Sequence, residues 1–283
     1  MNILISGVNG FIGGDLVTYF NQNKDHHVIG IGRRDETPGI NYYHADLSDR
    51  QSVGKFIEEI RSKGLIIEAF IHCASVLAEA DTQKDINLFI QNNLITENAI
   101  LIVKELGIKT LINLSTIGVY PNSDGEYAET SPVKPSKNFE CLYGLAKFCS
   151  EELFDFYLLP EKVNVINLRL SQVYGDRMRD DRIYKIMENE MKATGKISVW
   201  SNGERVSNFV SIDVVMSAIN HFLTAEKSGL FNVGGENISY KQLAEKIIEK
   251  NGNTEATVCL VNKGVVSKVY INCDKLRNEL KNS

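Results

Sequence analysis

Three glycines near the beginning of the chain limit its possible folds more than any other feature. They are spaced Gly7-x-x-Gly10-x-x-Gly13, directly after the apolar run at residues 1–5 and directly before an amphipathic stretch at residues 11–20. The pattern predicts a strand, a tight turn and a helix in immediate succession. In such a turn, glycines permit a left-handed backbone angle, let a pyrophosphate approach the main chain and let the helix pack closely on the strand.

The same turn predicts a dinucleotide-binding loop. A helix that begins there presents its free N–H groups and the positive end of its dipole to phosphates. The alternative is an ordinary glycine-rich turn, but the position between a strand and a helix favours the dinucleotide. The candidate cofactor-binding residues of this loop are Gly7, Asn9, Gly10, Phe11 and Ile12.

The composition excludes several other classes of protein. The 283 residues carry a formal net charge of −5 and no basic block, so we expect no nucleic-acid partner. We expect no membrane span, and no signal peptide because the apolar N-terminal run lacks a charged leader. The five cysteines are scattered and never spaced Cys-x-x-Cys, which is typical of thiols in a reducing, cytoplasmic setting. The five histidines form no spaced ligand set, so we expect no metal site.

From Val28 onward, strand-like and helix-like segments alternate, which predicts a parallel, doubly wound sheet. The second strand ends in Gly32-Arg33-Arg34, and the acids Asp35 and Glu36 follow only after it. In dinucleotide-binding folds an acid at this point holds the 2′-hydroxyl of NAD, whereas an arginine suits the 2′-phosphate of NADP. Arg33 therefore favours NADP(H) over NAD, and the alternative is a solvent-exposed loop arginine.

Further cofactor candidates follow the next strands. Asp46, followed by Leu47, either accepts a hydrogen bond from an adenine amino group or caps a turn. The strand at residues 68–75 ends in the small residues Cys73, Ala74 and Ser75, which would let a cofactor lie across the sheet edge.

A long helix is predicted from about residue 85 to residue 106, and it carries Asn92 and Asn93 in an otherwise apolar face. We include Asn93 among the cofactor-side candidates. An asparagine inside a helix usually bonds the backbone or bound water, which makes a structural role the competing interpretation.

The reacting groups are predicted in the next two segments. A strand at residues 109–114 delivers Ser115 and Thr116 at its carboxyl end, and a helix that begins near Glu140 carries Tyr143 and Lys147. Residues four apart on a helix share a face, so the phenol and the ammonium group should project together. With a hydroxyl at a strand end and a glycine loop upstream, this pair predicts a reaction centre.

The chain resembles the extended short-chain dehydrogenase/reductase family, the NAD(P)-dependent sugar-nucleotide epimerases, dehydratases and reductases. The matching motifs run in the family's order along nearly the whole chain: Gly7-x-x-Gly10-x-x-Gly13, Asp46-Leu47, the strand ending in Ala74, Ser115-Thr116-x-x-Val119-Tyr120, Tyr143-x-x-x-Lys147, Leu168-Arg169-x-x-x-Val173-Tyr174-Gly175, Phe209-Val210-x-Ile212-Asp213 and Phe231-Asn232-Val233-Gly234. The resemblance implies that Tyr143 exchanges a proton with the substrate and that Lys147 also holds the nicotinamide ribose. It further implies that Thr116 donates to the developing oxyanion, with Ser115 beside it as a second substrate-binding hydroxyl.

The departures from the family pattern narrow the reaction. Family dehydratases carry Asp-Glu after the catalytic threonine, whereas this chain has Ile117-Gly118. The resemblance therefore implies 4-epimerisation or 4-keto reduction of a nucleoside-diphosphate sugar rather than dehydration. Gln172 stands where the family usually has asparagine, and Ser207-Asn208 stand where it has Arg-Asp, so we take Gln172 and Arg205 as substrate-binding candidates. Two alternatives remain open, an NADPH-dependent reductase of a small carbonyl and a non-catalytic NAD(P)-sensing regulator.

The predicted fold is α/β, a Rossmann-like doubly wound parallel sheet with a smaller C-terminal substrate-binding lobe interleaved in sequence. We assign residues 1–172 plus about 205–228 to the NAD(P)-binding domain and residues 173–204 plus 229–283 to the lobe. A homodimer is also predicted, because helices like the one that carries Tyr143 commonly pair in this family. The apolar outer side of that helix comprises Phe148, Leu153, Phe156 and Tyr157.

Overall fold

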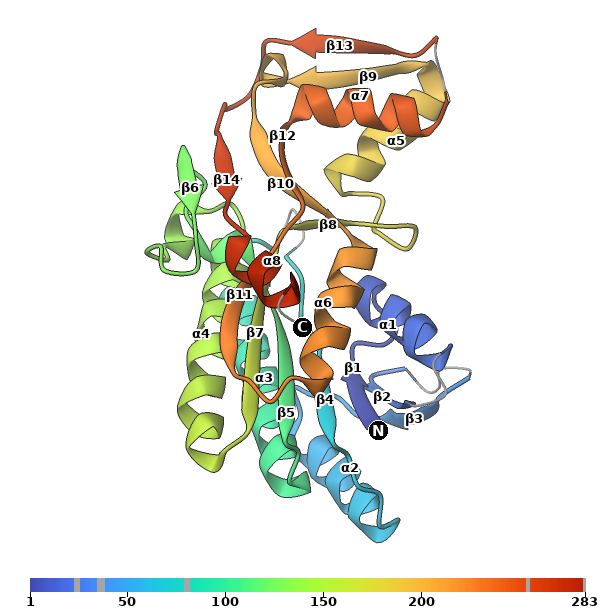
Figure 1. Cartoon of the computed structure of the whole chain (residues 1–283), viewed down its shortest axis with the longest axis vertical. Coiled ribbons are helices and arrows are strands. Elements are labelled where there is room, and N and C mark those ends of the chain that lie inside the picture. Colours follow the sequence, from blue (N-terminus) through green and yellow to red (C-terminus); the bar gives the residue numbers. More distant parts are fainter. Residues whose placement is uncertain (23–25, 35–38, 79–81, 253–254, 282–283) are drawn as a thin grey trace.

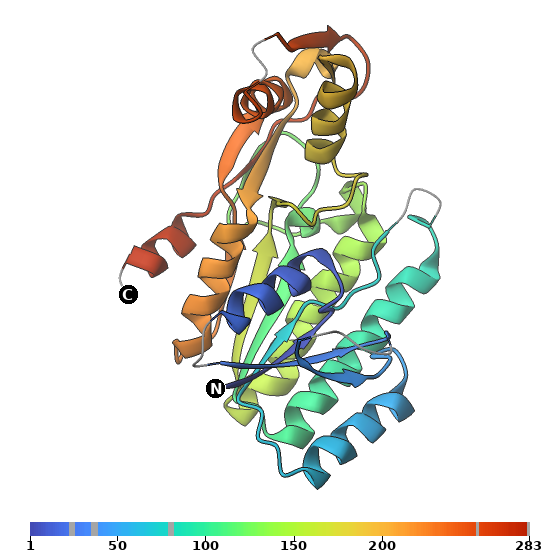
Figure 2. The same ribbon diagram turned by 90° about the vertical axis from the view of Figure 1, so that its right-hand side faces the viewer.

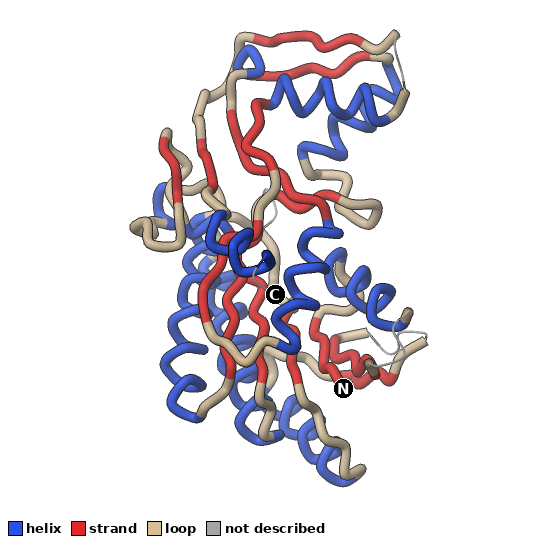
Figure 3. The backbone as a smooth tube through the Cα atoms, viewed as in Figure 1, coloured by secondary structure: helices blue, strands red, loops and turns tan. Residues whose placement is uncertain are grey.

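A computed structural model describes residues 1–22, 26–34, 39–78, 82–252 and 255–281 (Figure 1). The chain forms a large parallel sheet covered by helices on both faces, and a smaller lobe that stands at one end of this sheet (Figures 1 and 2). Figure 3 shows that the large unit alternates strands and helices, as the sequence pattern predicts.

The large sheet has the strand order β3-β2-β1-β4-β5-β7-β11, and all of its neighbours pair in parallel. Its strands are β1 Asn2–Ser6, β2 His27–Gly32, β3 Asn41–His44, β4 Ala69–His72, β5 Thr110–Thr116, β7 Asn164–Leu170 and β11 Gly229–Val233. The chain winds outward in one direction from β1 to β3 and in the other from β4 onward. The order therefore reverses between β1 and β4, which is where open α/β sheets bind ligands at their carboxyl edge. The prediction of a doubly wound parallel sheet is confirmed.

Helices bury an apolar face on each side of this sheet. One side holds α1 Phe11–Asn21, α6 Ile212–Thr224 and α8 Asp274–Lys281, and the other holds α2 Arg50–Ser62, α3 Ile86–Leu106 and α4 Cys141–Leu158. Phe20 and Phe222 are fully buried in the first core, and Phe154 in the second. The side chain of Asp49 caps α2, and Gly107 ends α3 in the left-handed conformation.

The smaller lobe consists of short strands and two helices. The strands β8 Gln172–Tyr174, β10 Val206–Ser211 and β12 Glu236–Ser239 form one sheet, and β9 Lys196–Trp200 pairs with β13 Thr257–Val261. The helices α5 Ile183–Thr194 and α7 Tyr240–Lys250 bury Met187 and Leu243 against these strands. A further pair, β6 Gly125–Tyr127 and β14 Val269–Ile271, lies between the two units.

The structure differs from the sequence-based division of the chain in three elements. Strand β11 pairs with β7 in the large sheet, and α8 buries Leu276 in the large core, although both segments were assigned to the lobe. Strand β10 pairs with β8 and β12 in the lobe, although it was assigned to the large unit. Local pattern does not reveal which sheet a strand joins, because that choice depends on distant partners.

Within the described residues, no helix combines the length and the apolar character needed to cross a membrane. The same residues contain no group of three or more histidine, cysteine or acidic side chains suited to a metal ion. The cytoplasmic location inferred from the cysteine pattern stays a prediction.

Candidate active site

A cavity of about 1050 Å³ opens at the carboxyl edge of the large sheet and extends to the lobe. This volume is close to the upper limit of the range for small-molecule binding sites, about 300–1000 Å³. All but one of the site residues predicted from sequence line it: Gly7, Asn9, Gly10, Phe11, Ile12, Arg33, Asp46, Leu47, Cys73, Ala74, Ser75, Ser115, Thr116, Tyr143, Lys147, Gln172 and Arg205. Asn93 is not among the lining residues. The cavity thus brings distant parts of the chain together.

The glycine loop lies at one end of the cavity, and its glycines pack so closely against neighbouring backbone that a side chain would not fit. Gly7 has φ +69°, and a Cβ there would lie 3.0 Å from the backbone nitrogen of Ala74. A Cβ on Gly13 would lie 2.2 Å from the carbonyl oxygen of Gly7. All residues in the first turn of α1 are described, and none of them is acidic. Gly10, at the N-cap position, has no side chain that could accept hydrogen bonds from the first helix amides. The loop therefore fits the diphosphate of a dinucleotide, because the first N–H groups of α1 face the cavity without a competing side-chain cap.

The end of β2 lines the cavity through Arg33 and Arg34, both exposed. The Arg33 carbonyl is bonded to Nε2 of His44 at 3.1 Å, and the Arg34 amide donates to the Tyr42 hydroxyl at 3.1 Å. These backbone bonds hold the strand end while leaving the Arg33 side chain beside the cavity. Asp35 and Glu36 lie outside the described residues.

Asp46 uses one carboxylate oxygen to stabilise the turn ahead of α2. Its Oδ1 accepts from the amide of Ser48 at 2.8 Å and from the Ser48 hydroxyl at 2.7 Å. The turn role that the sequence left open is therefore present, and Asp46 lines the cavity as well.

A buried hydroxyl holds the end of β4 in place. The Ser6 Oγ accepts from the amides of Cys73 and Ala74 at 3.1 and 3.0 Å and is bonded to Nδ1 of His72 at 3.1 Å. Burial lowers the pKa of His72 to about 3, so this imidazole is neutral at physiological pH. The backbone at Cys73 and Ala74 is thus positioned by a neutral hydrogen-bond pair beneath it.

Asn92, rather than Asn93, supports the next loop. Its Oδ1 accepts from the Ser75 hydroxyl at 2.8 Å and from the Val76 amide at 2.9 Å, and its Nδ2 donates to the Val76 carbonyl at 2.9 Å. The side-chain amide of Asn93 donates to the Phe89 carbonyl within its own helix. Helical phase could have identified Asn92, because Leu88, Asn92, Ile95 and Ala99 form one buried stripe.

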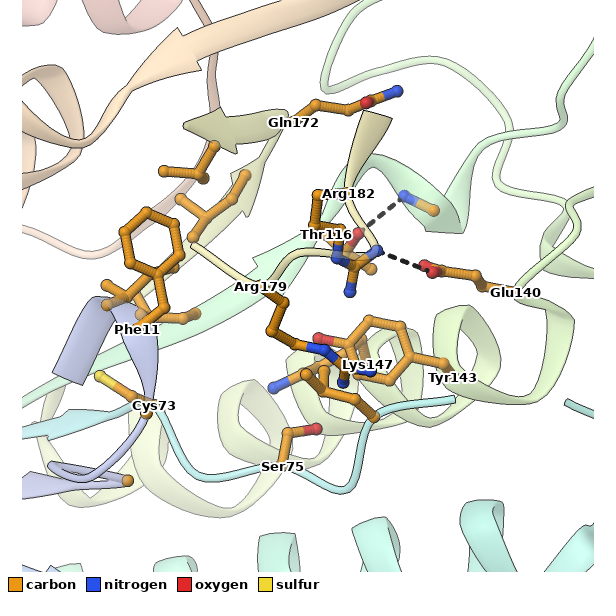
Figure 4. Close-up of a pocket in the computed structure, with 18 of the residues that line it drawn as sticks. Phe11, Cys73, Ser75, Thr116, Glu140, Tyr143, Lys147, Gln172, Arg179 and Arg182 are labelled. Carbon is orange, nitrogen blue, oxygen red and sulfur yellow. Dashed lines mark hydrogen bonds and ion pairs between the residues drawn. The ribbon is translucent and has the colours of Figure 1, made fainter. Parts of the chain in front are cut away.

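Thr116, Tyr143 and Lys147 face the same part of the cavity (Figure 4). The Thr116 Oγ1 accepts from the Gly118 amide at 3.0 Å, which leaves its hydroxyl proton available to an acceptor in the cavity. The ammonium nitrogen of Lys147 lies 5.8 Å from the centroid of the Tyr143 ring. The predicted grouping of these three side chains is therefore present in the structure.

Burial shifts the pKa values of Tyr143 and Lys147 in the directions that favour the neutral form of each side chain. It raises the pKa of the Tyr143 phenol to about 12, and the Glu140 carboxylate adds to this increase. A side-chain hydrogen bond with Ser75 and the charge of Arg182 act in the opposite direction. Burial also lowers the pKa of Lys147 to about 8. An additional positive charge beside the phenol would therefore have a large effect on its ionisation.

The Ser115 hydroxyl donates to Oε1 of Glu151 beneath the cavity. Glu151 also accepts from Arg169, whose Nε and Nη2 lie 3.0 Å from Oε1 and 2.6 Å from Oε2, and both side chains are almost fully buried. Arg169 Nη1 donates to the Tyr120 hydroxyl at 2.9 Å. Ser115 was predicted to bind substrate, but its hydroxyl is engaged by Glu151 and supports the strand that ends in Thr116.

At the lobe end of the cavity, Gln172 donates through Nε2 to the Ser207 hydroxyl at 2.8 Å. The guanidinium carbon of Arg205 lies 5.6 Å from the centroid of the Phe139 ring and 5.2 Å from that of Tyr240. Within the described part of the chain, the buried Nε of Arg205 has no hydrogen-bond partner. Its two aromatic neighbours therefore orient the guanidinium group at the lobe end of the cavity.

Comparisons with known proteins identify the family and the fold of the chain. A sequence model described as the NAD dependent epimerase/dehydratase family matches residues 3–234. The chain is 26% identical over 270 residues to dTDP-D-glucose 4,6-dehydratase from Dictyostelium discoideum, a match that covers 87% of this chain and 61% of that protein. The chain thus spans about three-fifths of the length of this curated relative.

Solved structures show the same fold at low sequence identity. The crystal structure of UDP-N-acetylglucosamine 4-epimerase from Bacillus cereus has a TM-score of 0.82 and 20% identity, covering 99% of this chain and 90% of that one. UDP-glucuronic acid 4-epimerase from Bacillus cereus, in complex with UDP-glucuronic acid and NAD, has a TM-score of 0.81 and 21% identity, covering 100% and 94%. dTDP-glucose 4,6-dehydratase from Bacillus anthracis, in complex with NAD, has a TM-score of 0.78 and 22% identity, covering 99% and 90%.

The family match extends from the glycine loop to the end of β11 and includes Thr116, Tyr143 and Lys147. The fold described above is that of the solved 4-epimerase and 4,6-dehydratase structures. The chain belongs to the NAD dependent epimerase/dehydratase family.

Proposed function

We propose that this protein transfers a hydride between a nicotinamide dinucleotide and a sugar carbon of a nucleoside-diphosphate sugar. The reaction is a 4-epimerisation or a 4-keto reduction rather than a dehydration. The observation that carries the proposal is the grouping of Thr116, Tyr143 and Lys147 in the cavity that the glycine loop also lines.

The bound nicotinamide supplies the hydride chemistry, and the chain supplies binding and proton transfer. The glycine loop, the ends of β2 and β4, and Lys147 hold the dinucleotide in this proposal. We propose NADP(H) as the preferred cofactor because the Arg33 side chain lies beside the cavity at the end of β2.

Tyr143 exchanges the proton of the substrate hydroxyl or carbonyl. Its pKa of about 12 keeps it a phenol in the protein alone, and the positive charge of an oxidised nicotinamide beside it favours the phenolate. Lys147 adds a second positive charge from the next turn of α4. Thr116 donates its free hydroxyl proton to the oxygen on which negative charge develops.

Two residues after Thr116 argue against elimination of water. Elimination needs an acid and a base near the sugar ring, whereas Ile117 and Gly118 provide neither. Gly118 instead donates its amide to Thr116, and its carbonyl oxygen would lie 2.5 Å from a Cβ on Gly144. The turn after Thr116 is therefore packed directly on α4.

The lobe end of the cavity supports an anionic substrate. Arg205 directly precedes β10, Ser207 lies within it, and both line the cavity. In this proposal Arg205 binds the diphosphate of the substrate, and Gln172 is held by Ser207 at the same end of the cavity.

We also propose that the protein is a homodimer through α3 and α4. Large apolar side chains are exposed on both helices, at Ile90 and Leu94 on α3 and at Phe156 and Tyr157 on α4. Phe148 and Leu153, which the sequence placed on the same outer side, pack instead against cores of the protomer.

The proposal is tested by titrating the protein with NADH and NADPH, and then incubating it with UDP- and dTDP-linked hexoses and their 4-keto derivatives. Epimerisation appears as a new sugar isomer without net cofactor turnover, whereas reduction consumes one NADPH for each ketone. A 4-keto-6-deoxy product would show dehydration and contradict the proposal. Turnover of simple ketones alone would identify a small-carbonyl reductase, and cofactor binding without any turnover would identify a sensor.

A further inference from the structure

Arg177 lies in the loop that follows β8, and it contacts α1 through Asp15. It lines the same cavity as Gly10 and Phe11. Its Nε is 3.2 Å from Oδ1 of Asp15, on α1. The proposed mechanism assigns no role to this arginine.

Two glycines bring the loop and the helix into close contact at this point. A Cβ on Gly14 of α1 would lie 2.8 Å from Nη1 of Arg177, so the guanidinium group occupies the space that a side chain at position 14 would need. A Cβ on Gly175 would lie 3.1 Å from the Phe11 ring. A glycine inside a helix lowers stability relative to alanine, and here it provides a place for Arg177 against the first turns of α1.

Asp15 interacts electrostatically with two further carboxylates, those of Asp176 and Asp213. Burial raises the pKa of Asp15, and the charges of Asp176 and Asp213 add to this increase, whereas Arg177 lowers it. These three carboxylates lie near a helix whose N-terminal amides are to receive a diphosphate. Their field repels that anion, and a positive charge beside them offsets this repulsion.

We propose that Arg177 is a ligand of the diphosphate of the bound dinucleotide and that Asp15 holds it in the free protein. The Arg177 side chain is 57% exposed, so it can turn from the carboxylate to a phosphate without repacking a core. Guanidinium groups bind phosphate oxygens through two parallel hydrogen bonds, which makes an arginine suited to this exchange. The inference rests on the proposed dinucleotide binding and adds a residue from the lobe side of the cavity.

The test measures binding of ADP-ribose, NADH and adenosine to the full chain by calorimetry and cofactor fluorescence. Arg177→Gln is expected to weaken the binding of ADP-ribose and NADH by about tenfold. The binding of adenosine, which has no phosphate, should be unchanged. Asp15→Asn is expected to strengthen the binding of ADP-ribose several-fold, because it removes the carboxylate that competes for Arg177 and one charge that repels the diphosphate. Arg50→Gln, which breaks the exposed ion pair between Arg50 on α2 and Glu97 on α3, is the matched control and should leave the binding of all three ligands unchanged.

Gly14→Ala provides an independent test. The added methyl group displaces the flexible end of Arg177 while favouring the helix, so thermal stability should be kept and ADP-ribose binding should weaken. In the Arg177→Gln background the same change should have little further effect, because the group it displaces is already absent.

Equal weakening by Asp15→Asn and Arg177→Gln would overturn the inference, because it would show that the pair only joins the two units. Unchanged ADP-ribose binding by Arg177→Gln would overturn it too. Failure of the unmutated protein to bind any dinucleotide would instead contradict the proposed function, and the two failures are therefore distinguishable.

Discussion

The ammonium nitrogen of Lys147 lies 5.8 Å from the centre of the Tyr143 ring, one turn further along α4. Both side chains line the cavity, and burial moves the pKa of each toward its neutral form, to about 12 for Tyr143 and about 8 for Lys147. A phenol and an amine held together in this way respond strongly to any charge brought next to them.

Tyr143→Phe should remove the proton-transfer group while leaving the cavity's shape unchanged. We expect turnover to fall by about 10²–10⁴-fold, the usual contribution of general acid–base catalysis, with NADH binding retained. Tyr270→Phe, at an exposed tyrosine on β14, is the control. Turnover close to that of the unmutated protein would exclude Tyr143 as the proton donor.

Lys147→Met should raise the stability of the protein without cofactor at pH 7. The pKa of Lys147 falls from 10.5 to about 8 on folding, so the charged amine destabilises the fold below pH 8, and this cost disappears as the pH rises to 10.5. The cost at pH 7 is at most on the order of 3 kcal/mol. Urea unfolding at pH 7 and pH 10 should show the gain at the lower pH and little difference at the higher one. A less stable variant at pH 7 would contradict this account.

The substitutions Thr116→Val and Ser115→Ala should have different effects on kcat and on stability, although the two residues are adjacent. Loss of the Thr116 donor is expected to raise the barrier by about 2.7–4 kcal/mol and to lower kcat. Ser115→Ala removes a hydrogen bond to Glu151 beneath the site. This change should lower the free energy of unfolding and have only a small effect on kcat. Steady-state kinetics and denaturant unfolding of both variants check this, and equal loss of kcat would mean that Ser115 contacts substrate.

Glu151→Gln should be strongly destabilising. Breaking a buried ion pair leaves an uncompensated charge on Arg169 and costs about 3–5 kcal/mol. Glu97→Gln breaks the exposed pair with Arg50 and should cost less than about 1 kcal/mol. Chemical unfolding of the two variants measures the contrast, and similar losses would show that the buried pair contributes no more than a surface one.

Phe156→Asp should convert the proposed dimer into a monomer. The side chain is 73% exposed on α4, so the change should leave the protomer's stability nearly unaltered. Light scattering coupled to gel filtration measures the mass, with Tyr270→Phe as the control. A monomeric unmutated protein would contradict the dimer itself.

Local patterns in the sequence were sufficient to predict the parallel sheet, the glycine loop and the grouping of Thr116, Tyr143 and Lys147. Strand, turn and helix signals at residues 1–20 are contiguous, and the spacing of Tyr143 and Lys147 places them on one helix face regardless of the rest of the fold. The carboxyl ends of parallel strands then meet at one edge, which brings Thr116 to the same cavity.

Contacts between distant residues were not predictable in this way. Glu151 lies 36 residues from Ser115 and 18 from Arg169, so nothing local indicates that it takes the hydroxyl predicted for substrate. Asn92 and Asn93 are neighbours in sequence, and only the buried phase of α3 decides which one supports the loop at Ser75. Nothing local in the sequence indicates that Arg177, in the loop after β8, pairs with Asp15 on α1.

The return of β11 to the large sheet has a consequence for how the chain folds during synthesis. Strand β7 is complete at residue 170, but its outer neighbour is supplied by residues 229–233. During translation of the intervening lobe, β7 presents an unpaired row of backbone groups, the kind of edge to which foreign strands add. The newly made chain is therefore most prone to aggregate in the interval before β11 leaves the ribosome, and slower translation of the lobe would lengthen that interval.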